Sequence, residues 1–477
     1  MAIFQVDCFD AVNGKIVPIF YDTKNSTLKF TNGENVINGE YDKSLGYYLY
    51  SNSPVKSHHV KHLRIIIGTR CNYKCSYCSQ SFNEKDNVET TIEDVDIFLS
   101  RLDEWLVGEP QRIELWGGEP LVYIKYLKKL IPSLRDKFKN AQITTITNGS
   151  LLTDEIVDFL LKYKIIFSVS HDAYGQAIRG KDILDDPKIL KIIDRASYEL
   201  DKIDSPIRSF SFNAVYSKAA YDPIKMREFF VKKLGRDISM SADPVLAVGR
   251  ASVDKETLLN DKELCEFSEN VALAALLDEN LSAYNLRNYR IGFVNSIING
   301  KNINNIGCKC NVPYGDSLVV DIKGNVYTCQ NFITNSDIKG SVYDFDNINI
   351  DNLYTLNDRV SCQTCPYVHM CKCGCPASKG NSFAETCRIK FAYFSGIFVS
   401  SIFRASDLIP LKIIAKEPIK FPVSQLIETN SGKYIDINTV DLPRIDFKRC
   451  EKYIEEKSHE RLLGIDGIVK KTHSPET

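Results

Sequence analysis

The sequence predicts an α/β protein built around an open, partial barrel of six strand–helix units. Between residues 61 and 245, short β-branched runs alternate with longer segments whose apolar residues recur at helical spacing. Buried strands that alternate with helices are typical of a parallel sheet. Six units are too few for a closed eight-stranded barrel, so we expect the sheet to remain open. In such folds the chemistry lies at the carboxyl ends of the strands.

Six segments of this region have the composition of strands. They are 62–67, 112–116, 143–147, 165–170, 210–215 and 237–241. The segments 92–106 and 153–163 between them have apolar residues at helical spacing. Thr153, which two acidic residues follow, has the character of a helix N-terminal cap. The partial barrel is therefore expected over residues 61–250.

Four other regions flank the predicted barrel. Residues 1–60 read as short strands joined by Asn-Gly turns and predict a small β-rich cap. Residues 251–307 are mostly helical and predict a linker. Residues 308–390 are rich in cysteine and predict an irregular domain. Residues 391–477 form a C-terminal extension of weak strands, with a charged helix expected at 449–461.

Composition argues against several classes of protein. The chain of 477 residues has a net charge of −1, which gives no sign of a nucleic-acid surface. The apolar run at 391–403 is too short to span a bilayer and favours a buried helix, so no membrane partner is expected. The 15 cysteines are clustered, and no signal segment precedes them. Free thiols in this number favour a reducing compartment, the cytoplasm.

Three cysteines follow the first predicted strand with the spacing Cys71-x3-Cys75-x2-Cys78. Three thiolates this close can hold three corners of a 4Fe–4S cluster and leave the fourth iron open to a substrate. A zinc site would need a fourth protein ligand, and none is adjacent. An iron–sulfur cluster is the favoured interpretation, with zinc as the alternative.

Eight further cysteines form a second group downstream. They are Cys308, Cys310, Cys329, Cys362, Cys365, Cys371, Cys375 and Cys387. A hairpin predicted at 321–327, with Gly324 in its turn, would deliver Cys329. Eight thiolates suffice for two fully ligated 4Fe–4S clusters.

Some candidate ligands belong to neither group. Cys8, Cys265 and Cys450 match no motif and are expected to be packing residues. His58, His59 and His62 lie close together, but no cysteine or carboxylate completes a metal site nearby. A solvated turn is the favoured interpretation of these histidines.

Both cysteine patterns, in this order, resemble those of radical S-adenosylmethionine (SAM) enzymes with a C-terminal SPASM domain. The resemblance covers roughly residues 61–390, and the downstream group fits the seven-cysteine SPASM pattern from Cys310 to Cys387. It implies three 4Fe–4S clusters, one for radical SAM chemistry and two auxiliary. SAM would bind the open iron of the first and be cleaved to a 5′-deoxyadenosyl radical. That radical would abstract hydrogen from a C–H bond, while the protein orients the substrate.

The resemblance also implies a SAM pocket at the strand ends. Its expected members are Tyr77, Gly117, Gly118, Glu119, Asn148, Ser170 and Arg179. Tyr77 would pack near the adenine, and the Gly-Gly turn would let the backbone approach the SAM amino group. Ser170 and Arg179 would contact the ribose and the carboxylate. An ordinary turn, a helix cap and a solvated arginine are the structural alternatives.

Two nearby segments bear on this pocket less directly. The family's usual Asp-Gly after the fourth strand is replaced by a sequence that begins His171-Asp172, which leaves the alignment of that loop open. Gly249-Arg250-Ala251, after the sixth strand, resembles a late loop of the family that meets SAM.

By resemblance, the first auxiliary cluster uses Cys308, Cys310, Cys329 and Cys375, and the second uses Cys362, Cys365, Cys371 and Cys387. Cys308 departs from the family because it lies only two residues before Cys310. Two outcomes stay open: Cys308 ligates the first auxiliary cluster, or one iron is left for a substrate or for Cys373. Both cysteines could equally be spare buried thiols.

SPASM enzymes of this size mostly modify ribosomally made peptides, so the resemblance implies an oxidative maturase. It would install a thioether, C–C or ether cross-link. The expected partners are a precursor peptide, docked on the β-rich cap by strand addition, and a reductant such as flavodoxin or ferredoxin. One alternative is a sulfatase-type maturase that makes formylglycine, whose aspartate base is replaced here by Gln330 unless Asp316 or Asp321 serves instead. The other is a non-enzymatic zinc scaffold. The sequence names no catalytic base.

Overall fold

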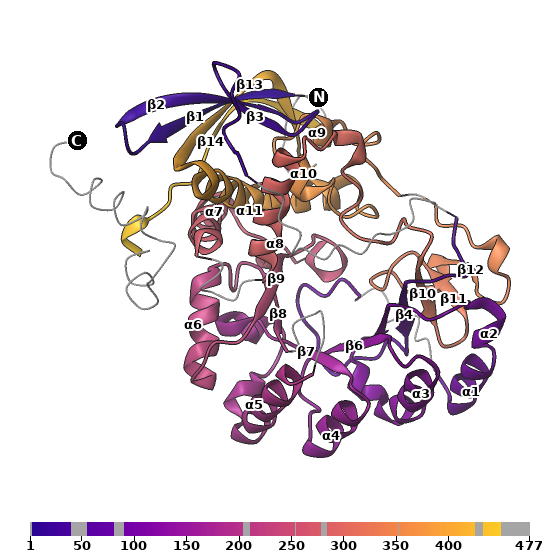
Figure 1. The fold of residues 1–477 in the computed structure, drawn as a ribbon. Coiled ribbons are helices and arrows are strands. Elements are labelled where there is room, and N and C mark those ends of the chain that lie inside the picture. The colour runs from indigo at the N-terminus through magenta and orange to yellow at the C-terminus, as the bar shows by residue number, and fades with distance from the viewer. Residues whose placement is uncertain are drawn as a thin grey trace.

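The structure is a computed structural model that describes residues 2–39, 55–80, 90–203, 210–252, 254–277, 284–351, 353–424 and 433–449. Two sheets organise the described chain (Figure 1). One has the strand order β12-β11-β10-β4-β5-β6-β7-β8-β9, and the other has the order β14-β13-β1-β2-β3. Cys450 and most of the helix expected at 449–461 lie outside the described residues.

All six strands predicted for the barrel are present, and they pair in chain order. They are β4 (His62–Ile66), β5 (Arg112–Trp116), β6 (Gln142–Thr147), β7 (Ile166–Ser170), β8 (Phe212–Tyr216) and β9 (Met240–Pro244). Every neighbouring pair is parallel, which confirms the predicted parallel α/β sheet. β4 is buried at all five positions, as expected for a strand covered on both faces.

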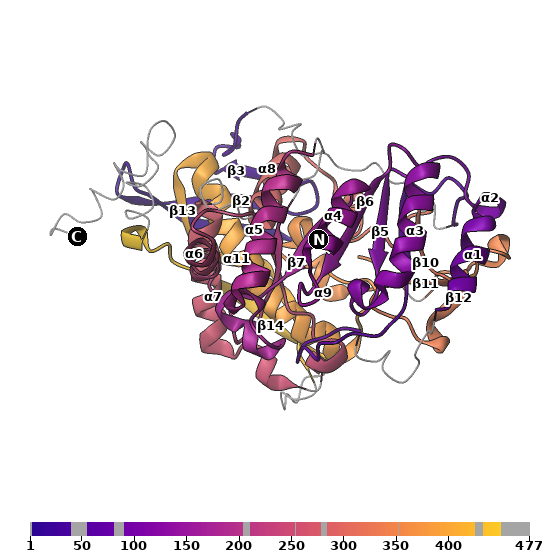
Figure 2. The same ribbon diagram turned by 90° about the horizontal axis from the view of Figure 1, so that it is seen from below.

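Helices cover the outer face of this sheet (Figures 1 and 2). They are α1 (Ile92–Ser100), α2 (Leu102–Trp105), α3 (Ile124–Lys137), α4 (Asp154–Lys162), α5 (Pro187–Asp201) and α6 (Pro223–Leu234). Thr153 caps α4 as predicted, because its side chain accepts a hydrogen bond from the Ile156 N–H. The helix expected at 92–106 is instead divided at Arg101 into α1 and α2.

The cysteine-rich region extends the barrel sheet beyond β4. β10 (Ser317–Asp321) pairs with β4 in parallel along its whole length, from Ser317 opposite His62 to Asp321 opposite Ile66. β11 (Asn325–Tyr327) and β12 (Ile338–Ser341) continue the sheet. The hairpin predicted at 321–327 is thus present, and Gly324 adopts the left-handed conformation its turn requires. The short helices α9 (Val360–Gln363) and α10 (Val368–Cys371) follow.

Strands from both ends of the chain form the second sheet. They are β1 (Ile3–Asp10), β2 (Lys15–Asp22), β3 (Thr27–Phe30), β13 (Leu408–Pro422) and β14 (Tyr434–Asp441). The N-terminal segment is β-rich, as predicted, but β1 lies between β2 and β13, so the C-terminal strands complete its sheet.

One face of this sheet packs on helices. Tyr21 of β2 meets Phe293 of α8 (Tyr284–Ile298) and Phe398 of α11 (Gly380–Ser406), and α7 (Asp261–Leu276) lies against α11. The apolar run at 391–403 lies within α11 and is largely buried, as predicted. Within the described ranges, no helix combines the length and the apolarity that a membrane crossing needs.

Candidate active site

The first cysteine motif lies in the loop after β4, at the carboxyl end of the barrel sheet. Cys71 is exposed, whereas Cys75 and Cys78 are partly buried. All three line a cavity of about 350 Å³, whose other walls come from the ends of β5, β6, β7 and β9. Functional side chains of parallel barrels gather at this end of the strands.

Every residue predicted for the SAM pocket lines this cavity. They are Tyr77, Gly117, Gly118, Glu119, Asn148, Ser170 and Arg179. Arg179 has a buried Nε with no hydrogen-bond partner among the described residues. A buried donor left unpaired costs about 1–3 kcal/mol. The cavity therefore fits a ligand that presents acceptor oxygens, such as a carboxylate, to Arg179.

The glycines of the Gly-Gly turn make room for the cysteine loop itself. A Cβ on Gly118 would overlap the carbonyl oxygen of Thr69, and one on Gly117 would lie 2.9 Å from the oxygen of Gly68. The Gly118 N–H donates to the Gly68 oxygen at 3.1 Å. The close approach that the sequence predicts is thus made to the chain's own backbone, which fixes the cysteine loop against the end of β5.

The side chains of Glu119 and Asn148 form hydrogen bonds with other residues of this chain. The buried Glu119 carboxylate accepts hydrogen bonds from the Thr147 hydroxyl at 2.6 Å, the Asn148 N–H at 2.7 Å and the Leu121 N–H at 3.1 Å. The Asn148 amide donates to Asn72 of the cysteine loop at 2.8 Å. Both side chains therefore hold the ends of β5 and β6 and the cysteine loop in register.

A buried trio, Tyr77, Asp172 and Arg179, stands at the back of the cavity. The Tyr77 hydroxyl donates to the Asp172 carboxylate and accepts from Arg179 at 2.6 Å. Asp172 is fully buried and also accepts from the Val215 N–H at 2.9 Å. Burial raises the pKa of Asp172, while Arg179 and Tyr77 oppose that rise. From the sequence, Asp172 is recognised only as a departure from the family pattern. Its position directly after a buried strand is the signal that could have identified it as a site residue.

The late loop also meets the cysteine motif. The Arg250 N–H donates to the Cys78 oxygen at 3.1 Å, and its guanidinium donates to the Cys75 oxygen at 3.1 Å. Gly249 has a positive φ, and a Cβ there would overlap the same Cys78 oxygen. These contacts tie the short 3-10 helix Gly249–Ser252 to the cysteine loop.

The second cysteine group falls into two sets. In the first set, the thiols of Cys310, Cys329 and Cys375 are close enough to interact electrostatically, and Cys308 lies near Cys310. The second set lines a small cavity of about 30 Å³, and its members are Cys362, Cys365, Cys371 and Cys387. Cys373 and Cys375 border the same cavity, and Cys373 is hydrogen-bonded to Cys362. The structure thus gathers the cysteines of both implied groupings, but Cys375 adjoins both sets.

The chemistry of these thiols fits iron–sulfur clusters. Burial raises the pKa of Cys329 to about 12, and the neighbouring thiols push it in the same direction. Such thiols become thiolates only beside a strong positive charge, which metal supplies. Within the described ranges, no three His, Cys, Asp or Glu side chains converge on a single-ion site. Ligands of a cube are spread over separate irons.

The three histidines before the barrel do not come together. The His58 ring stacks on Phe345 and its Nδ1 bonds the Trp105 oxygen at 2.8 Å, while His59 is exposed. His62 is buried as the first residue of β4, so a solvated turn is wrong for it. Cys8 is fully buried as predicted, whereas Cys265 is exposed on α7 and is not a packing residue.

Sequence comparisons identify the barrel region. The family model of the Radical SAM superfamily matches residues 65–200. The radical SAM cyclopropyl synthase TigE of Paramaledivibacter caminithermalis is 22% identical over 182 residues, which cover 34% of this chain and 37% of that protein. A GTP 3′,8-cyclase of Campylobacter jejuni is 29% identical over 146 residues, 29% of this chain and 43% of that protein. The matched segment spans about two fifths of the length of these relatives.

Solved structures share the fold over a longer stretch. A histidine-tagged form of anSMEcpe with bound AdoMet matches with a TM-score of 0.54 and 19% identity, over 72% of this chain and 99% of that one. Native anSMEcpe with bound AdoMet and the Cp18Cys peptide matches with a TM-score of 0.52 and 20% identity, over the same shares. A match to this superfamily implies a 4Fe–4S cluster and SAM. Residues 65–200 of this chain are therefore a Radical SAM domain.

Proposed function

We propose that this protein is a radical SAM maturase that oxidatively modifies a ribosomally made peptide, by a thioether, C–C or ether cross-link. One observation carries the proposal: the loops of both cysteine groups border one cavity. Cys71, Cys75 and Cys78 line it, and so does Asn331, two residues after Cys329. The Gln80 amide donates to the Gln330 oxygen at 2.7 Å and joins the two loops.

The residues around the first motif would have different roles in binding the cluster and SAM. Bound there, a 4Fe–4S cluster and SAM would supply a 5′-deoxyadenosyl radical. Cys71, Cys75 and Cys78 would hold the cluster. Arg179, with its unpaired Nε, would bind the SAM carboxylate, and Tyr77 with Asp172 would keep Arg179 in place.

Residues 308–390 would form the SPASM domain, with two auxiliary clusters. Cys308, Cys310, Cys329 and Cys375 would hold one, and Cys362, Cys365, Cys371 and Cys387 the other. A cross-link removes two hydrogens from the peptide, one as an atom and the other as a proton and an electron. The pairing of β10 with β4 keeps the loop of Cys329 beside the cavity, which favours the first auxiliary cluster as the electron acceptor.

Asp243 is the carboxylate best placed to accept the proton. It is the penultimate residue of β9 and lines the cavity with a side chain that is 51% exposed. The Tyr289 hydroxyl donates to it at 3.2 Å, and the Lys309 ammonium lies 3.8 Å away. Glu119, in contrast, is bound by three donors of its own chain.

The alternative sulfatase-type maturase requires a base beside Cys329, where Gln330 stands. Asp316 is buried and paired with Lys61 at 3.1 Å, and Asp321 caps the hairpin turn. Neither lines the cavity. These two aspartates therefore give that alternative no support.

Peptide docking by strand addition would use β14. β1 is enclosed by its neighbours, and residues 34–36 pair with the outer edge of β3. Deletion of residues 1–55 would remove the sheet's central strand, so proline scanning of β14 is the cleaner test. Alternate N–H groups of an edge strand point outward. Peptide affinity should fall at alternate positions without loss of stability, and equal affinity at every position would dispose of the docking site.

Anaerobic reconstitution tests the proposed function. We expect about twelve irons per chain, from three cubes. A SAM-dependent change in the EPR spectrum of the reduced protein and formation of 5′-deoxyadenosine should follow. A candidate peptide should lose two hydrogens per cross-link in mass spectrometry. A colourless protein that holds zinc would establish the scaffold alternative instead.

A further inference from the structure

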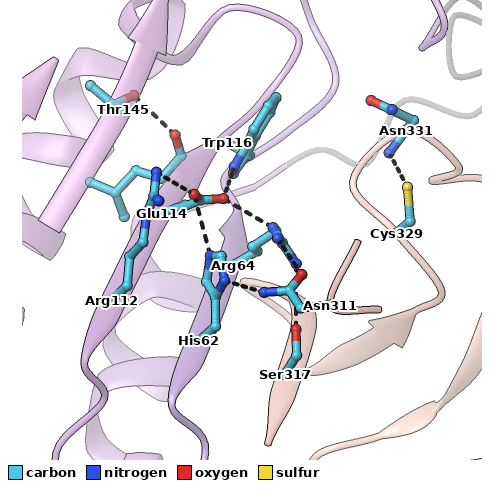
Figure 3. A network of polar contacts seen from close by, with 11 residues as sticks. His62, Arg64, Arg112, Glu114, Trp116, Thr145, Asn311, Ser317, Cys329 and Asn331 are labelled. Carbon is cyan, nitrogen blue, oxygen red and sulfur yellow. Dashed lines mark hydrogen bonds and ion pairs between the residues drawn. The ribbon is translucent and has the colours of Figure 1, made fainter. Parts of the chain in front are cut away.

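A buried ionic network joins the barrel to the second cysteine group (Figure 3). At its centre lies Glu114 of β5, with a side chain only 11% exposed. Its Oε2 accepts from the Arg64 Nε at 2.9 Å and from the Trp116 Nε1 at 3.0 Å. Its Oε1 lies 2.7 Å from an Arg112 nitrogen. Two guanidinium groups therefore face one carboxylate.

The network carries one net positive charge, because Arg64 and Arg112 face a single carboxylate and His62 is neutral. The His62 Nδ1 accepts from the Asn311 amide, so its proton lies on Nε2, 3.3 Å from Glu114. Burial lowers the pKa of His62, which keeps the ring uncharged near pH 7. Although burial opposes it, the cationic neighbours hold the pKa of Glu114 well below its usual range. One positive charge remains uncompensated within the network.

That charge lies close to the thiols of the first set. Arg64 donates to the Asn311 Oδ1 at 2.7 Å, and Asn311 directly follows Cys310. The Arg64 guanidinium is also close enough to Cys310 and Cys329 to interact electrostatically with both thiols. At the other end of the network, Trp116 lines the cavity at the first cysteine motif. The network thus connects the two cysteine groups through one buried arginine.

We propose that Arg64 tunes the reduction potential of the iron–sulfur cluster at Cys310, Cys329 and Cys375, and that Glu114 partly offsets this charge. The inference rests on the proposed function, in which the second group holds auxiliary clusters. A reduced cluster carries one more negative charge, so a nearby cation stabilises the reduced state and raises the potential. Arg64 acts as a positioning and charge-bearing residue, because it does not line the cavity at the first cysteine motif.

Removal of the positive charge and removal of the negative charge should shift the midpoint potential in opposite directions. Arg64→Gln keeps a hydrogen-bond donor but removes the positive charge, and it should lower the midpoint potential. Glu114→Gln removes the negative charge at nearly constant volume, and it should raise the potential. A purely structural role would instead degrade the cluster in both variants. Arg64→Lys retains the charge and should stay closest to the unaltered protein, which leaves a second comparison if Arg64→Gln does not fold.

The potentials are measured by redox titration followed by EPR, in a background with Cys71, Cys75 and Cys78 changed to alanine. Arg195→Gln, on the surface beside Asp158, is the matched control and should not move the potential. Shifts of the same sign in Arg64→Gln and Glu114→Gln, or no shift in either, would overturn the inference. If the background protein binds no iron, the proposed function fails as well. With about eight irons bound and unmoved potentials, the inference fails alone.

Discussion

The two cysteine groups are assembled in opposite ways, although a loop of each borders the same cavity. The first motif is one short loop, Cys71 to Cys78. Gly118 and Gly249 have no side chain, so the backbone at both positions can pack closely against the chain of this loop. The second group gathers cysteines that are up to about eighty residues apart, through β10 pairing with β4 and through α11. A local motif can therefore lose its metal without losing the fold, whereas the second group depends on tertiary structure.

The turn between Cys371 and Cys375 illustrates that dependence. Lys372 and Cys373 both have positive φ, which is costly for residues other than glycine. The buried guanidinium of Arg359 offsets this cost by donating to the oxygens of Cys373, of Cys375 at 2.9 Å and of Ser378 at 2.6 Å. A residue outside the cysteine pattern thus sets the shape of the second group.

Changing Cys71, Cys75 and Cys78 to alanine together should have the largest effect. We expect complete loss of 5′-deoxyadenosine formation and of the SAM-dependent EPR change, while about eight of about twelve irons remain. Iron analysis and EPR check both. Cys265→Ala is the control, because this exposed thiol lies outside both groups. Loss of all iron in the triple variant would contradict the auxiliary clusters at the second group, and the proposed function with them.

Arg359→Gln should damage the second group selectively. Buried carbonyls would lose charged hydrogen bonds, so we expect the free energy of unfolding to fall by about 3 kcal/mol. Iron content should drop while the SAM-dependent EPR change persists. Denaturant unfolding and iron analysis measure this. Arg195→Gln should cost less than about 1 kcal/mol because its ion pairs are on the surface.

Gly118→Ala should damage the first motif instead. The added Cβ would overlap the Thr69 oxygen, which cannot move without displacing the cysteine loop. We expect a destabilisation of about 2 kcal/mol and loss of the SAM-dependent EPR change, with the second group intact. Gly39→Ala is the matched control, since the nearest atom to its Cβ would be Ile298 Cδ1 at 4.0 Å. Equal behaviour of the two variants would contradict the packing argument.

Mild acid should weaken the link between the two regions. Because the pKa of His62 is lower in the folded state, His62 becomes protonated in the unfolded chain at a pH where it is still neutral in the folded chain. Stability from this group is full above the unfolded pKa and declines as pH falls below about 6.5, by at most about 1.4 kcal/mol per pH unit. Unfolding between pH 7.5 and 5.5 measures this slope. His62→Gln should flatten it, and an unchanged slope would remove His62 from the account.

Cys373→Ser should have the smallest effect. Cys373 is hydrogen-bonded to Cys362, and serine retains a donor there. We expect unchanged iron content, in contrast to Cys375→Ser, which should lose iron from the first set. Iron loss in Cys373→Ser equal to that in Cys375→Ser would make Cys373 a ligand.

Local signals predicted a large part of this molecule. The six barrel strands, the Thr153 cap and the first cysteine motif each depend on a few adjacent residues, and the periodicity of the chain reveals them. Contacts between residues that are far apart in the sequence could not be predicted. No local pattern indicates that Lys309 lies near Asp243. The sequence likewise does not distinguish His62 from His58 and His59, because only the pairing of β4 with β5 places it beside Glu114. Burial of polar groups is decided by tertiary contacts.

The position of β1 constrains how the molecule can be made. Its partner β13 lies about 400 residues further along the chain, with Asp10 opposite Leu408. At roughly 5–20 residues per second, a ribosome would deliver β13 roughly 20–80 seconds after β1. Until then Phe4 and Val6 have no strand on that side, although both are fully buried at the end. β1 is therefore enclosed on this side only long after its own synthesis, and in that interval it is a natural site for chaperone capture.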